Sequence, residues 1–393
     1  MKLHDRIRLI PRNNWDYGFT ALVSSLLGAV RGASQAPGIE KIFHQHPVWT
    51  TSGRTSLYTI LRSLNLPAGS KVGVPLFCCS VVFNAICQAG FSPRFIDSNL
   101  DDYNIALEDI RRKRNDLVAM VVVHMFGNPC DMDAILDVTG NLHVIEDCAQ
   151  SMFSSYKGRQ TGSLSTASFF SFRCGKYISA GEGSAILCRD EELYRRVEQV
   201  VASFETWSSS KMIVNALSTF VKATLYNRPW YGLIGHPIGM RLDKKLNLTA
   251  KDGFETRQIA PSHLALIEAR LADFEKRIDV QRKHARLLQS LLTPGILSLP
   301  INTSGNAFQF ALRFKSSAQR DAMSTYLFEH GIDTAKYLDT IADEARADYG
   351  YKGDCPNAEQ LAKTTLLVPI HYTLSTRDIE HAANVINAFF CKI

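Results

Sequence analysis

Two stretches decide the fold of this chain: HVIEDCAQ at residues 143–150 and ASFFSFRCGK at residues 167–176. Each starts with aliphatic or aromatic residues, typical of a buried strand, and continues into the small and polar residues typical of the turn after a strand. Asp147 ends the first run, and Lys176 follows the second. Because ligands bind in open α/β sheets beyond the carboxyl ends of the strands, we expect both side chains in one crevice.

Similar apolar runs precede these two stretches and alternate with helical ones. The runs begin at residues 71, 93 and 117, and the helical stretches lie near 55–64, 80–89, 107–113 and 132–138. Strands that are apolar on both faces and separated by helices indicate a mainly parallel sheet with helices on both sides. The sequence therefore predicts a large α/β/α domain over residues 51–260, preceded by an N-terminal arm over residues 1–50.

A smaller unit is expected after Pro261. Apolar residues at heptad-like spacing predict one long connecting helix that contains Leu264, Ile267, Leu271, Phe274 and Ile278. The strand FQFALRF and helices near 317–330 and 376–390 follow it. Residues 261–393 are therefore predicted to form the connecting helix and a small C-terminal α/β domain.

The composition excludes several classes of protein. Of the 393 residues, 46% are hydrophobic and 21% are charged, and the formal net charge is +6, as in an ordinary globular chain. The basic residues form no block of like charge, so nucleic-acid binding is not expected. The nine cysteines include no CxxC pair, which indicates reduced thiols in the cytoplasm, and we expect no metal site. The N-terminus has no apolar run long enough for a signal peptide.

Aromatic and aliphatic residues are concentrated over residues 205–250, which we interpret as an insertion in the large domain. Lys222, Arg228 and Pro229 interrupt it, so it contains no run of about 18 apolar residues and is not expected to span a membrane. Three interpretations stay open: a cover on the core, a contact between subunits, or an amphipathic surface that touches a membrane.

The chemistry of the crevice depends on Lys176. A lysine placed after a buried strand is desolvated, and this burial, with Arg173 nearby, should lower the pKa of its amine and favour the neutral form that attacks an aldehyde. An aldehyde cofactor with a ring nitrogen needs a carboxylate to keep that nitrogen protonated, and Asp147 is the candidate. Lysine and aspartate together indicate pyridoxal 5′-phosphate, although Asp147 taken alone is better explained as a helix cap.

The phosphate of such a cofactor also needs a site. Residues 51–56 read TSGRTS and stand at the start of a predicted helix, where free backbone N–H groups and the helix dipole bind anions. Most starts of this kind only cap a helix. Ser171, shortly before Lys176, adds a hydroxyl to the same crevice.

An ordered series of motifs resembles one family. GRTSLYTIL, VPLFCCSVVFNAICQAGFSPRFID, VVVHMFGNPCDMDAI, VIEDCAQS and YKGRQTGSLSTASFFSFRCGKYISAGEGSAIL occur in this order between residues 53 and 187. Together they are similar to the DegT-type nucleotide-sugar aminotransferases, a branch of the fold type I pyridoxal phosphate enzymes. The resemblance implies a fold type I homodimer whose active site lies at the subunit boundary.

The resemblance also implies roles for individual residues. Lys176 would form the Schiff base and carry the proton, Asp147 would pair with the pyridinium nitrogen, and Gln150 would lie near the phenolic oxygen of the cofactor. The phosphate would be taken by four positions: Ser171, Gly53, Arg54 and Thr55. The implied reaction is ping-pong: an amino acid, usually glutamate, aminates the cofactor, and a keto sugar nucleotide collects the amine.

Two positions depart from the family pattern. Cys79 stands where the family has an aromatic residue over the cofactor ring, so stacking would have to come from Phe77 or Phe83. The segment that reaches into the neighbouring subunit in the family reads Gly-Tyr-Asn-Tyr-Arg, whereas residues 253–257 read GFETR. Glu255 would repel a phosphate there, so it either turns away or serves another role, and Arg257 and Glu255 are candidate substrate contacts.

His124, in VHMFG, is the remaining candidate. It follows a predicted strand near the crevice and would either contact substrate or be a packed, hydrogen-bonded structural residue.

Two other functions compete with aminotransfer. Sugar dehydratases of the same family usually carry histidine in place of the lysine, so Lys176 argues against them. A non-catalytic member of the fold, which binds a ligand or a membrane partner through residues 205–250, is the other alternative, and the departures at Cys79 and Glu255 leave it open.

Overall fold

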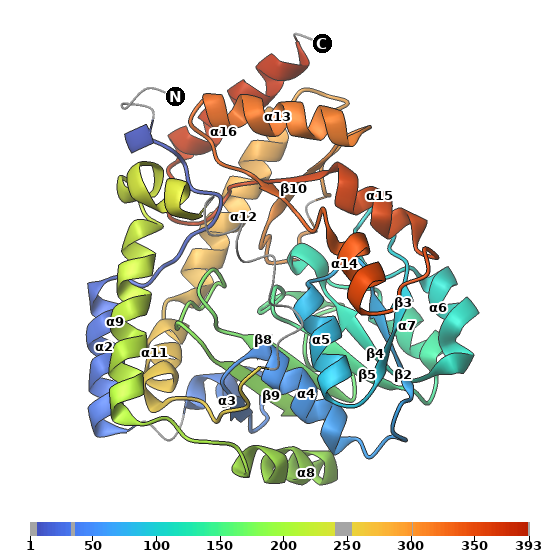
Figure 1. Cartoon of the computed structure of the whole chain (residues 1–393). Helices are drawn as coiled ribbons and strands as arrows, with labels where there is room; N and C mark the ends of the chain where they lie inside the picture. The colour runs from blue at the N-terminus through green and yellow to red at the C-terminus, as the bar shows by residue number, and fades with distance from the viewer. Residues whose placement is uncertain (1–5, 33–35, 240–253, 301, 392–393) are drawn as a thin grey trace.

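The computed structural model describes residues 6–32, 36–239, 254–300 and 302–391, and among these the strands form a seven-stranded, a three-stranded and a two-stranded sheet. Figure 1 shows the seven-stranded sheet in the lower half of the molecule and the C-terminal elements above it. Gly253 and residues 240–250 of the predicted insertion lie outside the described residues.

The large sheet is mainly parallel, as predicted. Its strands follow the order β1 (Val48–Thr50), β9 (Ser184–Cys188), β8 (Ala167–Ser171), β5 (His143–Asp147), β4 (Leu117–Val123), β2 (Lys71–Pro75) and β3 (Ser92–Ile96). From β8 to β3 the neighbouring strands are parallel, whereas β1 and β9 pair antiparallel at one edge. Because β5 and β8 are adjacent and parallel, the turns that follow Asp147 and Ser171 leave the sheet side by side.

All four predicted helices of this layer are present. The helices are α4 (Gly53–Ser63), α5 (Ser80–Gln88), α6 (Leu107–Lys113) and α7 (Met132–Thr139), and α8 (Glu191–Ala202) follows β9. The hydroxyl of Ser52 caps α4 by accepting a hydrogen bond from the Thr55 N–H at 3.3 Å. This cap fixes the start of α4 at the end of β1, next to β8.

The N-terminal arm contributes two helices, α2 (Phe19–Arg31) and α3 (Pro37–Phe43), which pack along one edge of the molecule. Three later elements lie at the same edge: α9 (Ser209–Leu225), the π-helical turn η3 (Tyr231–Gly235) and α11 (Pro261–Leu271). Figure 1 shows α2, α9 and α11 side by side at the left edge. Gly28 permits close packing here, because a Cβ at this position would lie only 2.9 Å from the Cβ of Ala265. None of the described helices is long and apolar enough to cross a membrane.

The prediction of one long helix after Pro261 is wrong, because two helices with a break between them occupy this segment. The helix α11 ends at Leu271, and α12 spans Phe274–Leu291 after a non-helical Asp273, which has ψ near 7°. The break turns the fully buried ring of Phe274 into the core, where it lies 4.1 Å from the ring of Phe153 and 5.7 Å from that of Tyr177. The burial of this aromatic ring outweighs the continuity of the helix.

The C-terminal elements include a second sheet. Its strands are β10 (Phe310–Arg313), β12 (Thr365–Val368) and β11 (Ala335–Lys336), with α13 (Ser317–Glu329) and α16 (Thr376–Phe390) packed against them. The helices α14 (Ile341–Asp348) and α15 (Pro356–Thr364) instead bury residues in the core of the large sheet. The predicted domain boundary at residue 260 stays a prediction.

We expect Gly127→Ala to lower the free energy of unfolding by about 2 kcal/mol more than Gly331→Ala does. Both glycines have a positive φ, 81° and 79°, so both substitutions carry the same backbone strain. A Cβ on Gly127 would overlap Asn306 Oδ1, whereas nothing lies within 4 Å of a Cβ on Gly331. Urea unfolding of the two variants measures the difference, and equal midpoints would show that the Gly127–Asn306 contact is not tight.

Candidate active site

Lys176 lies in the turn after β8. Gly175, with φ of 88°, bends the chain here, and the backbone N–H of Lys176 donates to the Arg173 carbonyl at 3.0 Å. The side chain passes over the ring of Phe308, whose centroid is 5.0 Å from Nζ. Burial lowers the pKa of Lys176, Asp147 and Cys79 oppose this shift, and Arg173 adds to it. The amine is therefore closer to its neutral, nucleophilic form than an exposed lysine.

Asp147 is the last residue of β5 and is buried, with 6% of its surface exposed. Its Oδ1 accepts a hydrogen bond from the Ala149 N–H at 2.9 Å. Burial raises the pKa of Asp147, while this hydrogen bond and the nearby Lys176 and His124 oppose the rise. Lys176 and Asp147 thus lie close enough to shift each other's pKa, in surroundings that penalise both charges.

The start of α4 adjoins the end of β8. A Cβ on Gly53 would lie 3.3 Å from the Phe169 ring and 3.8 Å from Ser171 Cβ. Thr55, which is fully buried, shares a hydrogen bond of 2.9 Å with the hydroxyl of Ser52. The predicted phosphate positions 53, 54, 55 and 171 are therefore neighbours in space.

Positive charge gathers at the same place. Burial lowers the pKa of Arg54, and the nearby charge of Arg173 lowers it further. Glu182, in the turn after Lys176, compensates part of this charge. Burial raises the pKa of Glu182. A hydrogen bond of 3.3 Å from the Thr51 hydroxyl and the nearby arginines 173, 54 and 257 oppose this rise. Two arginines held close together beside a helix N-terminus form a site that a bound anion stabilises.

Gln150 connects the large sheet to the C-terminal elements. Its Oε1 accepts from the Phe126 N–H at 3.0 Å, and its Nε2 donates to the hydroxyl of Tyr337 at 3.0 Å. Burial raises the pKa of Tyr337, and Cys79 and Asp147 are close enough to contribute. Tyr337, which follows β11, therefore brings an aromatic side chain from the small sheet into the crevice.

Cys79 is exposed at the start of α5 and lies within electrostatic range of Lys176, Arg54 and Tyr337. Phe77 and Phe83, the two aromatic alternatives, are both fully buried in the core. Phe83 packs edge-on against Phe95 and Tyr349, and Phe77 packs edge-on against Tyr337 and Phe126. Tyr337 therefore lies within electrostatic range of Cys79, while both phenylalanines are packed in the core.

His124 has a structural environment. The residue is fully buried, its Nδ1 accepts from the Cys130 N–H at 3.1 Å, and its Nε2 therefore carries the proton that it donates to Glu146 at 3.0 Å. Both ring nitrogens are thus engaged by the protein, as expected for a hydrogen-bonded structural residue, the second of the two interpretations of His124.

The ligand atoms of His124, Glu146 and Cys148 lie within 4.8 Å of one another, a spacing that could hold a metal ion. Glu146 already accepts hydrogen bonds from the Gly162 and Leu164 N–H groups, at 2.8 and 2.9 Å, and from the Ser165 hydroxyl at 3.0 Å. Burial raises the pKa of the Cys148 thiol well above its usual value. A protonated thiol and a carboxylate saturated with hydrogen bonds suit a structural network rather than a metal centre.

Glu255 is exposed and paired with an arginine of its own chain. Its side chain is 74% exposed, and Oε2 lies 2.8 Å from a guanidinium nitrogen of Arg257. Arg257 itself is buried, packs over the ring of Trp207 at 5.2 Å and lies close enough to Glu182 to affect its pKa. Of the two candidate substrate contacts, only Arg257 borders the charged cluster within this chain.

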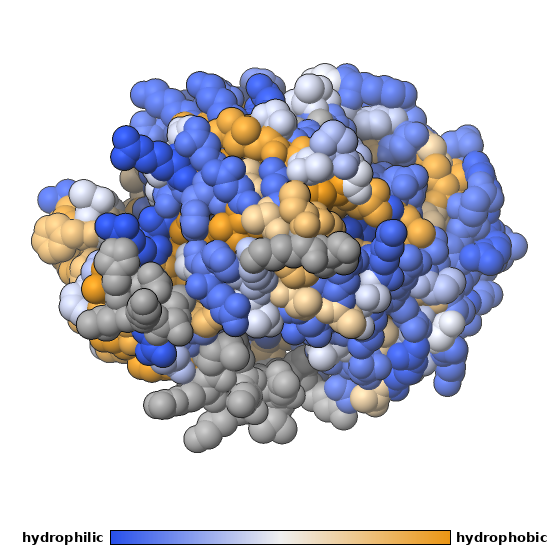
Figure 2. Space-filling view, turned by 90° about the horizontal axis from the view of Figure 1, so that it is seen from above, coloured by the Kyte–Doolittle hydropathy of each residue, from blue (hydrophilic) through white to orange (hydrophobic). Residues whose placement is uncertain are grey.

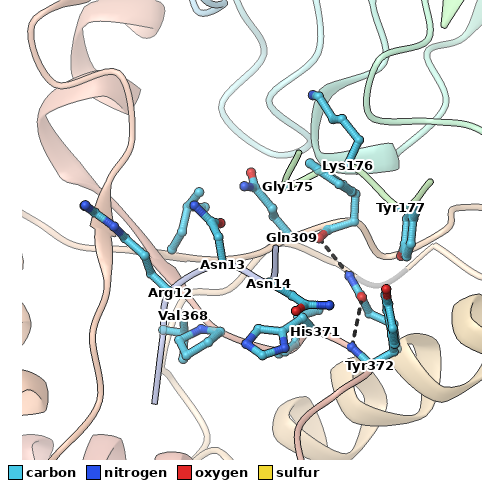
Figure 3. A pocket seen from close by; sticks show the side chains of 15 residues that line it. Arg12, Asn13, Asn14, Gly175, Lys176, Tyr177, Gln309, Val368, His371 and Tyr372 are labelled. Carbon is cyan, nitrogen blue, oxygen red and sulfur yellow. Dashed lines mark hydrogen bonds between the residues drawn. The ribbon is translucent and has the colours of Figure 1, made fainter. Parts of the chain in front are cut away.

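A pocket lies on the backbone side of Lys176. It is lined by the arm, the turn at Lys176, α12 and the segment after β12, including Arg12, Asn13, Asn14, Gln309 and His371. In Figure 3 the Lys176 side chain extends away from Asn14, His371 and Tyr372, so Nζ lies outside this pocket. Gln281 closes the pocket by donating to the Phe308 carbonyl at 2.8 Å and accepting from the Tyr372 N–H at 3.3 Å.

The crevice fits pyridoxal phosphate. A desolvated amine stands at the end of one strand, a buried carboxylate ends the neighbouring strand, and two arginines with a helix N-terminus lie beside them. Each group has the charge that one part of the cofactor requires: the aldehyde, the ring nitrogen and the phosphate.

A comparison with protein families decides the assignment. The model of the DegT/DnrJ/EryC1/StrS aminotransferase family matches residues 39–389. The chain belongs to this family. It is an aminotransferase with the fold of the type I pyridoxal phosphate enzymes.

The curated relatives carry related names. The chain is 29% identical to the spore coat polysaccharide biosynthesis protein SpsC of Bacillus subtilis over 86% of this chain and 83% of that protein. It is 26% identical to the dTDP-4-dehydro-2,3,6-trideoxy-D-glucose 4-aminotransferase of Saccharopolyspora spinosa over 86% and 82%. A shorter match, 36% identical, covers 39% of this chain and 43% of a GDP-perosamine synthase of Escherichia coli O157:H7, so it spans less than half of that relative.

Solved structures share the fold. The aminotransferase TlmJ of Streptoalloteichus hindustanus superposes with a TM-score of 0.78 over 98% of this chain and 99% of TlmJ, at 20% identity. The sugar aminotransferase Spr1654 of Streptococcus pneumoniae, in its PMP form, also has a TM-score of 0.78, over 98% of both chains at 16% identity.

Sequence reasoning missed Tyr337 and Phe308. Phe308 stands in the predicted strand FQFALRF, so an aromatic residue there was visible but its position over Lys176 was not. Tyr337 lies outside every motif, and only the packing of the small sheet on the large one brings it to Gln150.

We expect Glu146→Gln to lower the free energy of unfolding by about 2–4 kcal/mol near neutral pH. The His124 ring and the Gly162 N–H both donate to Glu146 Oε2, and in the variant these two donors would face an amide N–H group that cannot accept their hydrogen bonds. Burial alone would raise the pKa of Glu146, but the hydrogen bonds from His124, Gly162 and Leu164 lower it below its usual value. The stabilisation from the charged group is therefore present above the unfolded-state pKa and is lost as the pH falls through the folded-state pKa.

Denaturant unfolding at a series of pH values tests this, with the exposed Glu275→Gln as the matched control. The difference in the free energy of unfolding between the native protein and Glu146→Gln should become smaller at acid pH. A gap that is small at neutral pH, or constant with pH, would contradict the role given to this network.

Proposed function

We propose that this chain transfers an amino group from an amino acid, glutamate, to a keto sugar attached to a nucleotide, with pyridoxal phosphate held at Lys176. The observation that carries the proposal is the buried pair of Lys176 and Asp147, whose surroundings lower the pKa of the amine and raise that of the carboxyl. The substrate class is supported by relatives named for dTDP-sugar aminotransfer and GDP-perosamine synthesis.

Bound pyridoxal phosphate would supply an aldehyde that takes up the amine and a ring that withdraws electrons from the reacting carbon. The neutral Nζ of Lys176 would hold the aldehyde until the amine of the amino acid displaces it, and the freed lysine amine would then carry the proton between the two carbons in each half-reaction. Asp147 would hold the proton of the ring nitrogen. The phosphate would be held by Ser171, Arg54 and the chain around Gly53 and Thr55 at the start of α4.

The two half-reactions would share this site in a ping-pong order, since the same lysine serves both. We further propose a homodimer with the active site at the subunit boundary. The exposed Glu255 and the segment around it would then lie near the partner's crevice rather than facing a phosphate of its own chain. An amino sugar nucleotide made in this way would be used for polysaccharide biosynthesis, the process named for the Bacillus subtilis relative.

We expect glutamate to convert the cofactor of the purified protein from its aldehyde form to its amine form, and Lys176→Ala to slow this conversion by about 10²- to 10⁴-fold. Absorbance of the cofactor measures it directly. The matched control is Lys157→Ala, since Lys157 is an exposed lysine in a turn that pairs with Asp133. Conversion by Lys176→Ala at the native rate would contradict the role of Lys176, and a native protein that binds the cofactor but is not converted by any amino acid would contradict aminotransfer.

A further inference from the structure

The helices α2 and α9 lie side by side and antiparallel at one edge of the molecule (Figure 1). At one end the ring of Trp15, just before α2, stacks on that of Tyr226, just after α9, with centroids 4.6 Å apart. At the other end Ala29 and Met212 pack in one small cluster. The two helices therefore present a single two-helix surface to solvent, which we name the α2–α9 surface.

This surface is mostly apolar. On α2 the exposed apolar residues are Phe19, Val23, Leu27 and Val30, at 70%, 38%, 44% and 80% exposure. On α9 they are Ile213, Val214, Leu217 and Val221, at 36%, 65%, 46% and 56%. The α2 set recurs every three or four residues, and so do Val214, Leu217 and Val221 on α9, with Ile213 beside them, so each set forms one stripe along its helix. Trp230, Ile234 and Ile238, which follow α9 in the chain, are also exposed.

Figure 2 shows hydrophobic residues gathered along the left margin of the molecule, the side on which Figure 1 places α2 and α9. The opposite faces of both helices are buried through small residues such as Ala21, Gly28, Ala216 and Ala223. The fold therefore already satisfies the inner faces, and the outer apolar stripes have no role in the core.

The charges on this surface have one sign. No Asp or Glu occurs from residue 17 to 39 or from residue 207 to 242, although the chain has 38 of them. Arg31, Lys211 and Lys222 are exposed at the ends of the two helices. A segment with an apolar stripe, basic flanks and no acidic residue is complementary to a surface that is apolar inside and negatively charged outside.

We propose that the α2–α9 surface binds an anionic lipid bilayer, with the apolar stripes entering the interface and the basic residues contacting lipid phosphates. Phe19, at the end of the α2 stripe, and the exposed Trp230 have the character of interfacial anchors. A second copy of the chain suits the surface less, because a two-fold interface would bring Arg31, Lys211 and Lys222 of two copies together with no acidic residue to neutralise them. The proposal does not depend on the reaction that the crevice catalyses.

The test is flotation of the full-length protein with two kinds of vesicle, one of phosphatidylcholine alone and one that also contains phosphatidylglycerol. The protein should float with the anionic vesicles and much less with the neutral ones, and the bound fraction should fall with added salt. The double variant Val30→Glu/Leu217→Glu should lose binding to the anionic vesicles. Both positions are exposed, so the fold and the glutamate half-reaction should be unchanged.

Two further variants sharpen the test. Leu297→Glu, at a residue that is 49% exposed and outside the surface, should bind vesicles as the native protein does. Lys211→Gln should weaken binding to anionic vesicles by about 5-fold, since one basic residue near an anionic surface contributes about 1 kcal/mol.

Three results would overturn the proposal. One is a native protein that does not float with anionic vesicles. Another is equal binding by the native protein and Val30→Glu/Leu217→Glu. The last combines two measurements. If light scattering without lipid shows that the double variant has half the mass of the native protein, and the native protein does not bind vesicles, the surface is a contact with a second copy.

Discussion

An amine and a carboxyl group are buried at the ends of adjacent parallel strands, where water does not compete for them. Asp147 ends β5, Lys176 follows β8, and the register pairs Asp147 with Phe169 of β8. In this setting each group alone would be driven towards its neutral form, and each opposes that shift in the other. The sheet therefore keeps a reactive amine and a partly stabilised carboxylate in one crevice, and the rest of the site is arranged around them.

The surrounding groups serve the same pair. Glu146 and His124 hold the turns on the far side of β5, so that Asp147 points into the crevice while its neighbour Glu146 is used for structure. On the other side Glu182 balances part of the positive charge of Arg54 and Arg173 beside α4. Tyr337 then joins the small sheet to Gln150. Groups from both sheets therefore meet around Lys176 and Asp147.

Much of this could be predicted from the sequence, because the signals were local. The strands, the capped start of α4 and the lowered pKa of Lys176 each follow from residues within one run and its turn. The break before Phe274 could not be predicted, since it depends on Phe153 and Tyr177, which are distant in the chain. The same reason applies to Tyr337. His124 was ambiguous because a histidine at a strand end looks the same whether its nitrogens face a ligand or, as here, Glu146 and Cys130.

The central claim is that Lys176 is the amine that binds the cofactor, and its most direct test is chemical. The native protein is incubated with pyridoxal phosphate and reduced with borohydride, and the modified peptide is identified by mass spectrometry. The account predicts one adduct per chain, on Lys176, at cofactor concentrations that leave the exposed lysines unmodified. An adduct on another lysine, or no adduct at all, would contradict it.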